Sequence, residues 1–171
     1  MKRLRVLFPT FILFAFAGVA ISAACQEREQ RRPSRYLIPE GYVGWIRIDF
    51  KVKDAPPLPV EDERYLFKIP HSGHLKTSSD IEYGWASGDD FYYSGKTRRK
   101  LVETMWGKGG MIWGQSNGSA EDSAGNKTAI YEHVFIGTEE QFKKCAWERD
   151  ENYNLKVGAI DEEKLKKCVE R

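Results

Sequence analysis

The chain contains 171 residues, with 27 Lys and Arg against 25 Asp and Glu and a formal net charge of +2 at pH 7. Residues 1–24 hold three of the basic residues and none of the acidic ones, so residues 25–171 carry a net charge of −1. This balance excludes the strongly basic surface that nucleic-acid-binding domains use, and we expect no nucleic-acid partner.

Residues 1–24 have the three regions of an export signal. Basic residues at positions 2, 3 and 5 precede an apolar run over residues 11–21, and small residues fill positions 22–24. The apolar run is shorter than the roughly 20 residues that span a bilayer comfortably. The sequence therefore predicts a signal peptide over residues 1–24 and an exported protein.

Small residues followed directly by Cys25 resemble the lipobox of bacterial lipoproteins. The resemblance implies that Cys25 becomes the lipid-bearing N-terminus and attaches the protein to a membrane of the cell envelope. Gln26 is similar to the residue found in lipoproteins of the outer membrane, so we expect an outer-membrane or periplasmic location. Ser22 stands where the lipobox usually has Leu, which keeps secretion after an A-x-A-like cleavage as the alternative.

The polar segment after Cys25 gives way to a single domain. Residues 26–34 are polar apart from one proline, which predicts a solvated tether over residues 25–34. The remaining residues 35–171 are enough for one β-rich domain with its own core.

The clearest strand pattern runs from Tyr42 to Phe50. Apolar residues and Gly take the even positions, while Arg47 and Asp49 take odd ones, a period of two that is typical of a half-buried strand. The order Arg-Tyr-Leu, Ile-Pro and Gly begins at Arg35 and returns at Arg64. The sequence predicts two similar strands, each bounded by a turn.

The next segments continue the β pattern. Residues 54–62 contain three prolines and predict a surface crossing. Alternation over residues 81–85, a four-residue turn-forming stretch and the aromatic run 91–93 predict a β-hairpin. The basic run 96–100 predicts solvated charges rather than a phosphate site.

Three further segments complete the β region. Residues 111–113 predict a short apolar strand between glycines. Residues 114–127 are almost all turn formers and predict a mobile loop. Residues 128–136 are apolar on both faces, which predicts a central strand between two layers.

The period changes after Gly137, and a helical segment is predicted over residues 138–171. Thr138 and Gln141 have the spacing of a capping box at the start of one helix. Asp161, followed by two glutamates and later by lysines, marks the start of a second helix with charges that suit the helix dipole.

The two remaining cysteines, Cys145 and Cys168, lie on the apolar faces of these helices. Because an exported chain favours disulfides and no C-x-x-C motif is present, we expect them to pair with each other. The bond would close a loop of about 22 residues and stabilise the fold by roughly 3 kcal/mol.

The sequence contains no recognisable catalytic or metal-binding motif. His71 and His74 lie in a turn, whereas the zinc motif H-E-x-x-H needs one helical face. Gly95-Lys96-Thr97 lacks the glycine that a P-loop requires at position 90, which is Asp. We therefore expect no metal, no cofactor and no assignable catalytic residue.

Aromatic side chains are the remaining candidates for ligand binding. Each of four tryptophans adjoins a small residue, which could leave one ring face open to a sugar: Trp45, Trp85, Trp106 and Trp113. With Tyr92 from the aromatic run, Trp85, Trp106 and Trp113 form the candidate ligand-binding set. Core packing is the alternative, because large rings also fill β-sandwich cores.

Three segments, RYLIPEGYVGW, RYLFKIP with the following SG-LKTSSDIEYGW, and VFIGTEEQFKK, resemble an uncharacterised family of exported bacterial domains over residues 35–144. The resemblance implies no activity, substrate or catalytic residue. The residues themselves predict a mainly β fold: an antiparallel, β-sandwich-like domain of seven or more strands with two short C-terminal α-helices.

The functional hypothesis is a non-catalytic envelope protein whose sheet presents loops to a glycan or an envelope protein. A hydrolase or peptidoglycan-active enzyme with a site assembled from scattered residues is one alternative. A subunit of an envelope assembly that pairs through an edge strand is another. A cleft with convergent carboxylates or histidines would favour the enzyme hypothesis. A flat aromatic face would favour the binding protein, and an unpaired strand edge would favour the assembly subunit.

Overall fold

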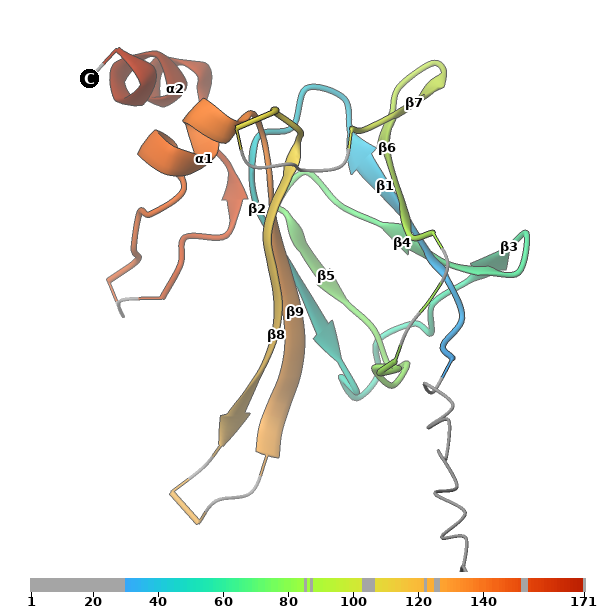
Figure 1. Ribbon diagram of the computed structural model, residues 1–171. Coiled ribbons are helices and arrows are strands. Elements are labelled where there is room, and N and C mark those ends of the chain that lie inside the picture. The colour runs from blue at the N-terminus through green and yellow to red at the C-terminus, as the bar shows by residue number, and fades with distance from the viewer. Residues whose placement is uncertain are drawn as a thin grey trace, which may run out of the picture.

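The computed structural model describes residues 30–84, 86, 88–102, 107–121, 123–124, 127–151 and 154–170. The predicted signal peptide and Cys25 lie outside these residues. The described chain forms ten strands and two helices (Figure 1). Their bounds are β1 Ser34–Pro39, β2 Gly44–Phe50, β3 Val60–Glu61, β4 Arg64–Lys68, β5 His74–Lys76, β6 Asp90–Ser94, β7 Arg98–Lys100, β8 Ile112–Glu121, β9 Lys127–Ile136, α1 Glu139–Cys145, β10 Gly158–Ala159 and α2 Glu162–Val169.

The strands form two sheets. The first has the order β3-β4-β1-β6-β7 and the second β10-β2-β9-β8, with β5 also paired to β2. The predicted mainly β fold with two C-terminal helices is confirmed, but the sheets are mixed rather than antiparallel. Strand β1 runs parallel to both β4 and β6, and β2 runs parallel to β5. Long connections, such as the proline-rich residues 54–59, return the chain in the same direction and make these parallel pairs.

The repeated Arg-Tyr-Leu segments lie side by side. Arg35 in β1 pairs with Leu66 in β4, and each strand leads through a Pro-containing turn into the second sheet. The turns close through the hydrogen bonds from Tyr42 N to Pro39 O at 3.1 Å and from Gly73 N to Pro70 O at 2.9 Å. After the turns, β2 and β5 again pair in parallel. The echo in the sequence therefore marks two neighbouring strand-turn-strand units that cross together from one sheet to the other.

The main core lies between the sheets. The alternation predicted for residues 42–50 is confirmed, because Ile46, Ile48 and Phe50 of β2 all face this core. Strand β9 contributes Val134 and Ile136 to the same core. Burial of each large apolar side chain contributes about 1.5–3 kcal/mol.

A second apolar cluster covers the opposite face of the β2-β9-β8 sheet. Trp45, Trp113, Phe135 and Phe142 belong to it, and α1 packs over them (Figure 1). Strand β9 lies between β2 and β8 and contacts an apolar layer on each side, as predicted for residues 128–136.

Two segments differ from the prediction. Residues 81–83 are not a strand; β6 pairs instead with β7 and β1. The predicted mobile loop over residues 114–127 is largely strand β8, which extends to Glu121 against β9. Turn-forming residues are tolerated there because most side chains after Trp113 in β8 are exposed, while β9 supplies the backbone hydrogen bonds.

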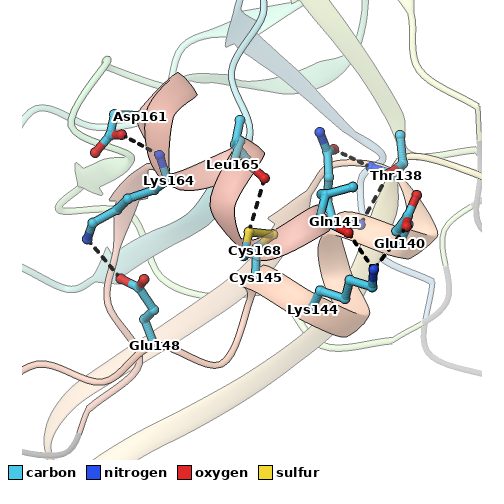
Figure 2. Close-up of a disulfide and its surroundings, with 11 residues drawn as sticks. Thr138, Glu140, Gln141, Lys144, Cys145, Glu148, Asp161, Lys164, Leu165 and Cys168 are labelled. Carbon is cyan, nitrogen blue, oxygen red and sulfur yellow. Dashed lines mark hydrogen bonds and ion pairs between the residues drawn. A yellow bond between two sulfur atoms is a disulfide. The ribbon is translucent and has the colours of Figure 1, made fainter. Parts of the chain in front are cut away.

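Both helices begin where the sequence predicted. Thr138 and Gln141 make the reciprocal hydrogen bonds of a capping box, and the carboxylate of Asp161 accepts a hydrogen bond from Lys164 N at the start of α2. The disulfide joins Cys145 and Cys168 with a Cα–Cα distance of 5.6 Å, which confirms the predicted pairing (Figure 2). No residue of α2 is fully buried, and this bond gives the helix a covalent attachment to α1 in addition to the backbone.

Within the part of the chain that the structure describes, no helix has both the length and the apolar content to cross a membrane.

Candidate functional site

A cavity of about 240 Å³ lies between the two sheets. The aromatic part of its lining includes Tyr36 from β1, Phe50 from β2 and Phe67 from β4, and the rest is mostly polar. Glu132 of β9 and Gln115 of β8 add polar groups from the second sheet. This volume is slightly below the range of about 300–1,000 Å³ typical of ligand pockets, which suits a small ligand.

The buried acid of this cavity is Glu132. It occupies an inward-facing position of β9 between Ile130 and Val134, and only 7% of its surface is exposed. The hydroxyl of Tyr36 donates to Glu132 Oε1 at 3.0 Å, and the amide of Gln115 donates to the same oxygen at 2.9 Å. One carboxylate oxygen therefore holds two neutral donors from two different sheets.

Burial changes the acid strength of these groups. Desolvation is the largest effect on Glu132 and raises the pKa of its carboxyl, although the hydrogen bonds from Gln115 and Tyr36 oppose it. Burial, with the nearby Glu132 charge, also raises the pKa of the Tyr36 phenol well above its ordinary value. The cavity thus holds a carboxyl that keeps its proton more readily than an exposed glutamate, beside a phenol that stays neutral.

The rim of the cavity is formed by the first described residues. Arg31 pairs with Asp89, which also accepts a hydrogen bond from Ser34 N at 2.8 Å. The hydrogen bond to Asp89 is the largest effect on Arg31 and raises the pKa of its guanidinium. The guanidinium of Arg32 lies 5.0 Å from the ring centre of Tyr65. The last residues of the predicted polar tether therefore contact the domain and border the cavity.

A second polar surface lies on the outer face of the β2-β9-β8 sheet. Asp49 accepts from Arg47 Nε at 2.8 Å and lies 2.5 Å from His74 Nε2. The guanidinium of Arg47 lies 4.0 Å from the ring centre of Tyr131. A cavity of about 190 Å³ and a shallower one of about 540 Å³ open over these residues.

On this face, Ser116 Oγ lies 2.8 Å from His133 Nε2. Burial and the charge of Arg47 lower the pKa of His133, which favours a neutral imidazole. Asp49 is bonded to Arg47 and His74, so it does not supply the acid of a Ser–His–Asp arrangement to His133.

Of the predicted aromatic ligand-binding set, the two members that the structure describes, Trp113 and Tyr92, lie apart. Trp113 is 1% exposed, its ring stacks on Phe142 at 5.6 Å between centres, and its Nε1 donates to Gly137 O at 2.8 Å. The prediction for Trp113 is therefore corrected: the glycine beside it leaves room for Phe142 rather than for a ligand. Trp45 is also buried, at 3% exposed.

Tyr92 lies on the other sheet. It is half-buried on β6, with the guanidinium of Arg35 6.0 Å from its ring centre, and is separated from Trp113 by the main core. Trp85 and Trp106, the other two members of the set, lie outside the described residues.

Glu132, Tyr36 and Gln115 are site residues that were not predicted from the sequence. One signal was present: Glu132 is an acid at an inward position of an otherwise apolar segment, TAIYEHVFI. Tyr36 and Gln115 carried no such signal, since their approach to Glu132 depends on how the two sheets pack.

Metal ligands do not gather in the described part of the chain, which contains no group of three or more His, Cys, Asp or Glu side chains able to hold a metal ion. Of the two turn histidines, His74 lies in β5 and contacts Asp49 across the parallel pair with β2.

Comparison with known proteins gives the fold relationship and the family. A candidate lipoprotein from Bacillus anthracis, known from its crystal structure, superposes with a TM-score of 0.55 at 23% sequence identity, over 74% of this chain and 85% of that chain. This similarity shows a shared fold. No curated protein matches this sequence significantly. The model of a family of unknown function, DUF6843, matches residues 30–146. The span takes in every strand from β1 to β9 and the whole of α1, so the chain belongs to the DUF6843 family.

Proposed function

We propose that the mature protein is a lipid-anchored protein of the cell envelope that binds a small polar ligand in the cavity between its sheets without transforming it. The single observation that carries the proposal is the buried carboxyl of Glu132, held by Tyr36 and Gln115 in a cavity of about 240 Å³.

A buried carboxyl is costly unless something compensates it. Transfer of a polar group from water into an apolar interior costs roughly 1–3 kcal/mol, and more for a charge. The positions on either side of Glu132 along the inner face of β9, Ile130 and Val134, are apolar, so an apolar residue would fit the same pattern. Perturbed acids in cavities concentrate at functional sites, which supports a ligand role for Glu132.

The envelope location rests on two supports. The residues before Cys25 resemble a lipobox, and the Bacillus anthracis protein of the same fold is itself described as a candidate lipoprotein. Arg31 at the cavity rim is six positions after Cys25, a reach of at most about 21 Å. A lipid on Cys25 would therefore keep the cavity close to the membrane surface.

The orientation follows from the same attachment. The start of β1 lies at the opposite end of the domain from α1 and α2 (Figure 1). An anchored domain would hold the cavity rim toward the membrane and present the disulfide-linked helices to the space beyond.

The anchor is tested by intact mass of the protein recovered from native envelopes and by labelling with radioactive palmitate. We expect lipid on Cys25 and none on the Cys25→Ser variant. An unmodified N-terminus in the native protein contradicts the anchor and leaves secretion as the location.

The binding function is tested on the mature protein with a panel of single sugars, amino acids and small amines, followed by ligand-observed NMR. We expect at least one class to bind and the Leu58→Trp variant to abolish binding, because Leu58 lines the cavity. Val102→Trp is the matched control, since Val102 is 69% exposed and does not line the cavity. Binding that survives Leu58→Trp places the site elsewhere.

A hydrolase is the second candidate, favoured by the 2.8 Å contact between Ser116 and His133. A fluorophosphonate probe would then label the protein at Ser116, and Ser116→Ala would remove the label. Absence of labelling at Ser116 in the folded protein counts against this candidate.

A further inference from the structure

We propose that the cavity recognises a cationic group, the ammonium of a small amine such as an amino sugar, with the Glu132 carboxylate as its counter-ion. This inference rests on the proposed binding function and adds the chemical class of the ligand.

Two of the rim charges form ion pairs within the chain, whereas Glu132 at the centre of the cavity forms none with a described residue. At the rim, Arg31 pairs with Asp89, and Asp80 lies 2.8 Å from Lys51 Nζ. The two groups that bond Glu132 are both neutral, a phenol and an amide. The ionised carboxylate would thus leave one negative charge inside the cavity, which a cationic ligand neutralises.

The exposed rim acid Glu82 resembles Glu132 in that the donors it is seen to bond are neutral. It accepts hydrogen bonds from the Tyr65 hydroxyl at 2.5 Å and from Arg32 N at 3.2 Å. The Arg32 guanidinium itself lies over the Tyr65 ring rather than in contact with Glu132. Solvent screens the charge of the exposed Glu82, whereas Glu132 is buried, so a cationic group gains most beside Glu132.

The aromatic part of the cavity wall strengthens this attraction. The ring of Tyr36 stacks between the rings of Phe67 and Phe91, with distances between ring centres of 4.7 Å and 4.2 Å. Phe50 packs edge-on to Phe67. Charges interact more strongly beside such walls than in water, because the local dielectric constant is low. An ammonium that donates to the carboxylate gains a charge-assisted hydrogen bond, about twice as strong as a neutral one.

Glu132→Gln removes the charge of this side chain with little change in its shape. Both hydrogen bonds to Glu132 end on Oε1. In Glu132→Gln the amide oxygen can keep both donors, while the formal charge is lost. The variant therefore preserves both hydrogen bonds, including the one from Tyr36 that joins the two sheets, and removes only the proposed counter-ion.

The experiment compares matched probes on the mature protein by isothermal titration calorimetry and ligand-observed NMR. The probes are glucosamine with glucose, and butylamine with butanol. We expect the amine of at least one pair to bind at least tenfold more tightly than its neutral partner. Glu132→Gln should remove that preference, with its fold checked by circular dichroism. Glu140→Gln, an exposed carboxylate on α1, is the matched control and should bind as the parent does.

The outcomes separate this inference from the proposed function. Neutral and cationic partners that bind equally, with binding lost in Leu58→Trp, overturn the counter-ion role of Glu132 and leave the cavity as a binding site. A preference for amines that persists in a folded Glu132→Gln protein overturns the counter-ion role as well. Failure of all four probes to bind overturns the amine proposal, while binding of another panel member that Leu58→Trp abolishes still supports the cavity.

Discussion

The Tyr36 hydroxyl on β1 donates to Glu132 Oε1 on β9 at 3.0 Å, and this hydrogen bond joins the two sheets through the interior of the domain. Residues 96 positions apart in the chain are thereby held together inside the protein. Both groups that donate to Glu132, the Tyr36 hydroxyl and the Gln115 amide, are neutral, so neither cancels the charge of the ionised carboxylate. The charge on Glu132 therefore affects both the stability of the fold and the binding of the proposed ligand.

We expect Glu132 to make the stability of the protein depend on pH. Burial raises its pKa in the folded state above the ordinary value of 4.5, so the folded state binds the proton more tightly than the unfolded chain does. Its contribution to stability is fully present below pH 4.5 and is lost as the pH rises through the raised pKa.

Urea denaturation between pH 4 and pH 8 measures this effect, since one proton can change the unfolding free energy by up to about 1.4 kcal/mol per pH unit. Glu132→Gln should lack this component and gain stability relative to the parent as the pH rises. Parallel pH profiles for the two proteins would contradict the prediction.

Loss of the disulfide should destabilise the domain by about 3 kcal/mol, because the bond closes a loop between residues separated by 23 positions. The variant is Cys145→Ser with Cys168→Ser, measured by urea denaturation. Hydrogen exchange over α2 should rise most, since that helix has no fully buried residue.

The parent protein in reductant is the control and should match the double variant. Unchanged exchange over α2 would show that packing alone holds the helix.

Two equivalent turn glycines should respond differently to the same substitution. Gly41 and Gly73 both have φ of +72°, so alanine costs each about 1–2 kcal/mol in backbone strain. An added Cβ at Gly41 meets nothing within 4 Å, whereas at Gly73 it would lie 2.7 Å from the backbone oxygen of Trp45.

We therefore expect Gly73→Ala to cost at least about 2 kcal/mol more than Gly41→Ala in unfolding free energy. Chemical denaturation of the two variants measures the difference. Equal losses would mean that the second turn can move away from β2.

Asp89 should hold the start of β1 against the domain. Asp89→Asn keeps an oxygen for Ser34 N but loses the ion pair with Arg31, and we expect a loss of about 1 kcal/mol. Faster hydrogen exchange at residues 34–36 is the more direct measurement.

Asp80→Asn is the control for Asp89→Asn, since both side chains of the Asp80–Lys51 pair are more than half exposed. No measurable change is expected there. An equal effect of the two substitutions would show that the Arg31–Asp89 pair contributes no more than a surface pair.

Local patterns in the sequence predicted the parts of the fold that depend on neighbours in the chain. The alternation in residues 42–50, the caps at Thr138 and Asp161 and the Cys145–Cys168 pair are all confirmed. The alternation depends on the direction of successive side chains, and the caps depend on hydrogen bonds between neighbours in the chain. The disulfide follows from the number of cysteines. All three can be read from the sequence alone.

The failures occurred where pairing partners come from distant segments. A hairpin was predicted over residues 81–93, with the segment 81–85 as the partner of β6. In the structure β6 pairs with β1 over five positions instead. The exposed polar stretch after Trp113 has turn-forming residues, yet β9 provides it with a strand partner. Local composition carries no information about which partner is available.

The sequence by itself determined a mainly β domain followed by two disulfide-linked C-terminal helices. The hydrophobic periodicity, the capping residues and the cysteine spacing that predict these elements act over a few positions or one loop. Only the tertiary structure decided that the sheets are mixed and that Trp113 is buried. It also brought Tyr36, Gln115 and Glu132 together around one cavity. These features depend on contacts between residues far apart in the sequence, whose free energies are set by the packing of whole sheets rather than by any local pattern.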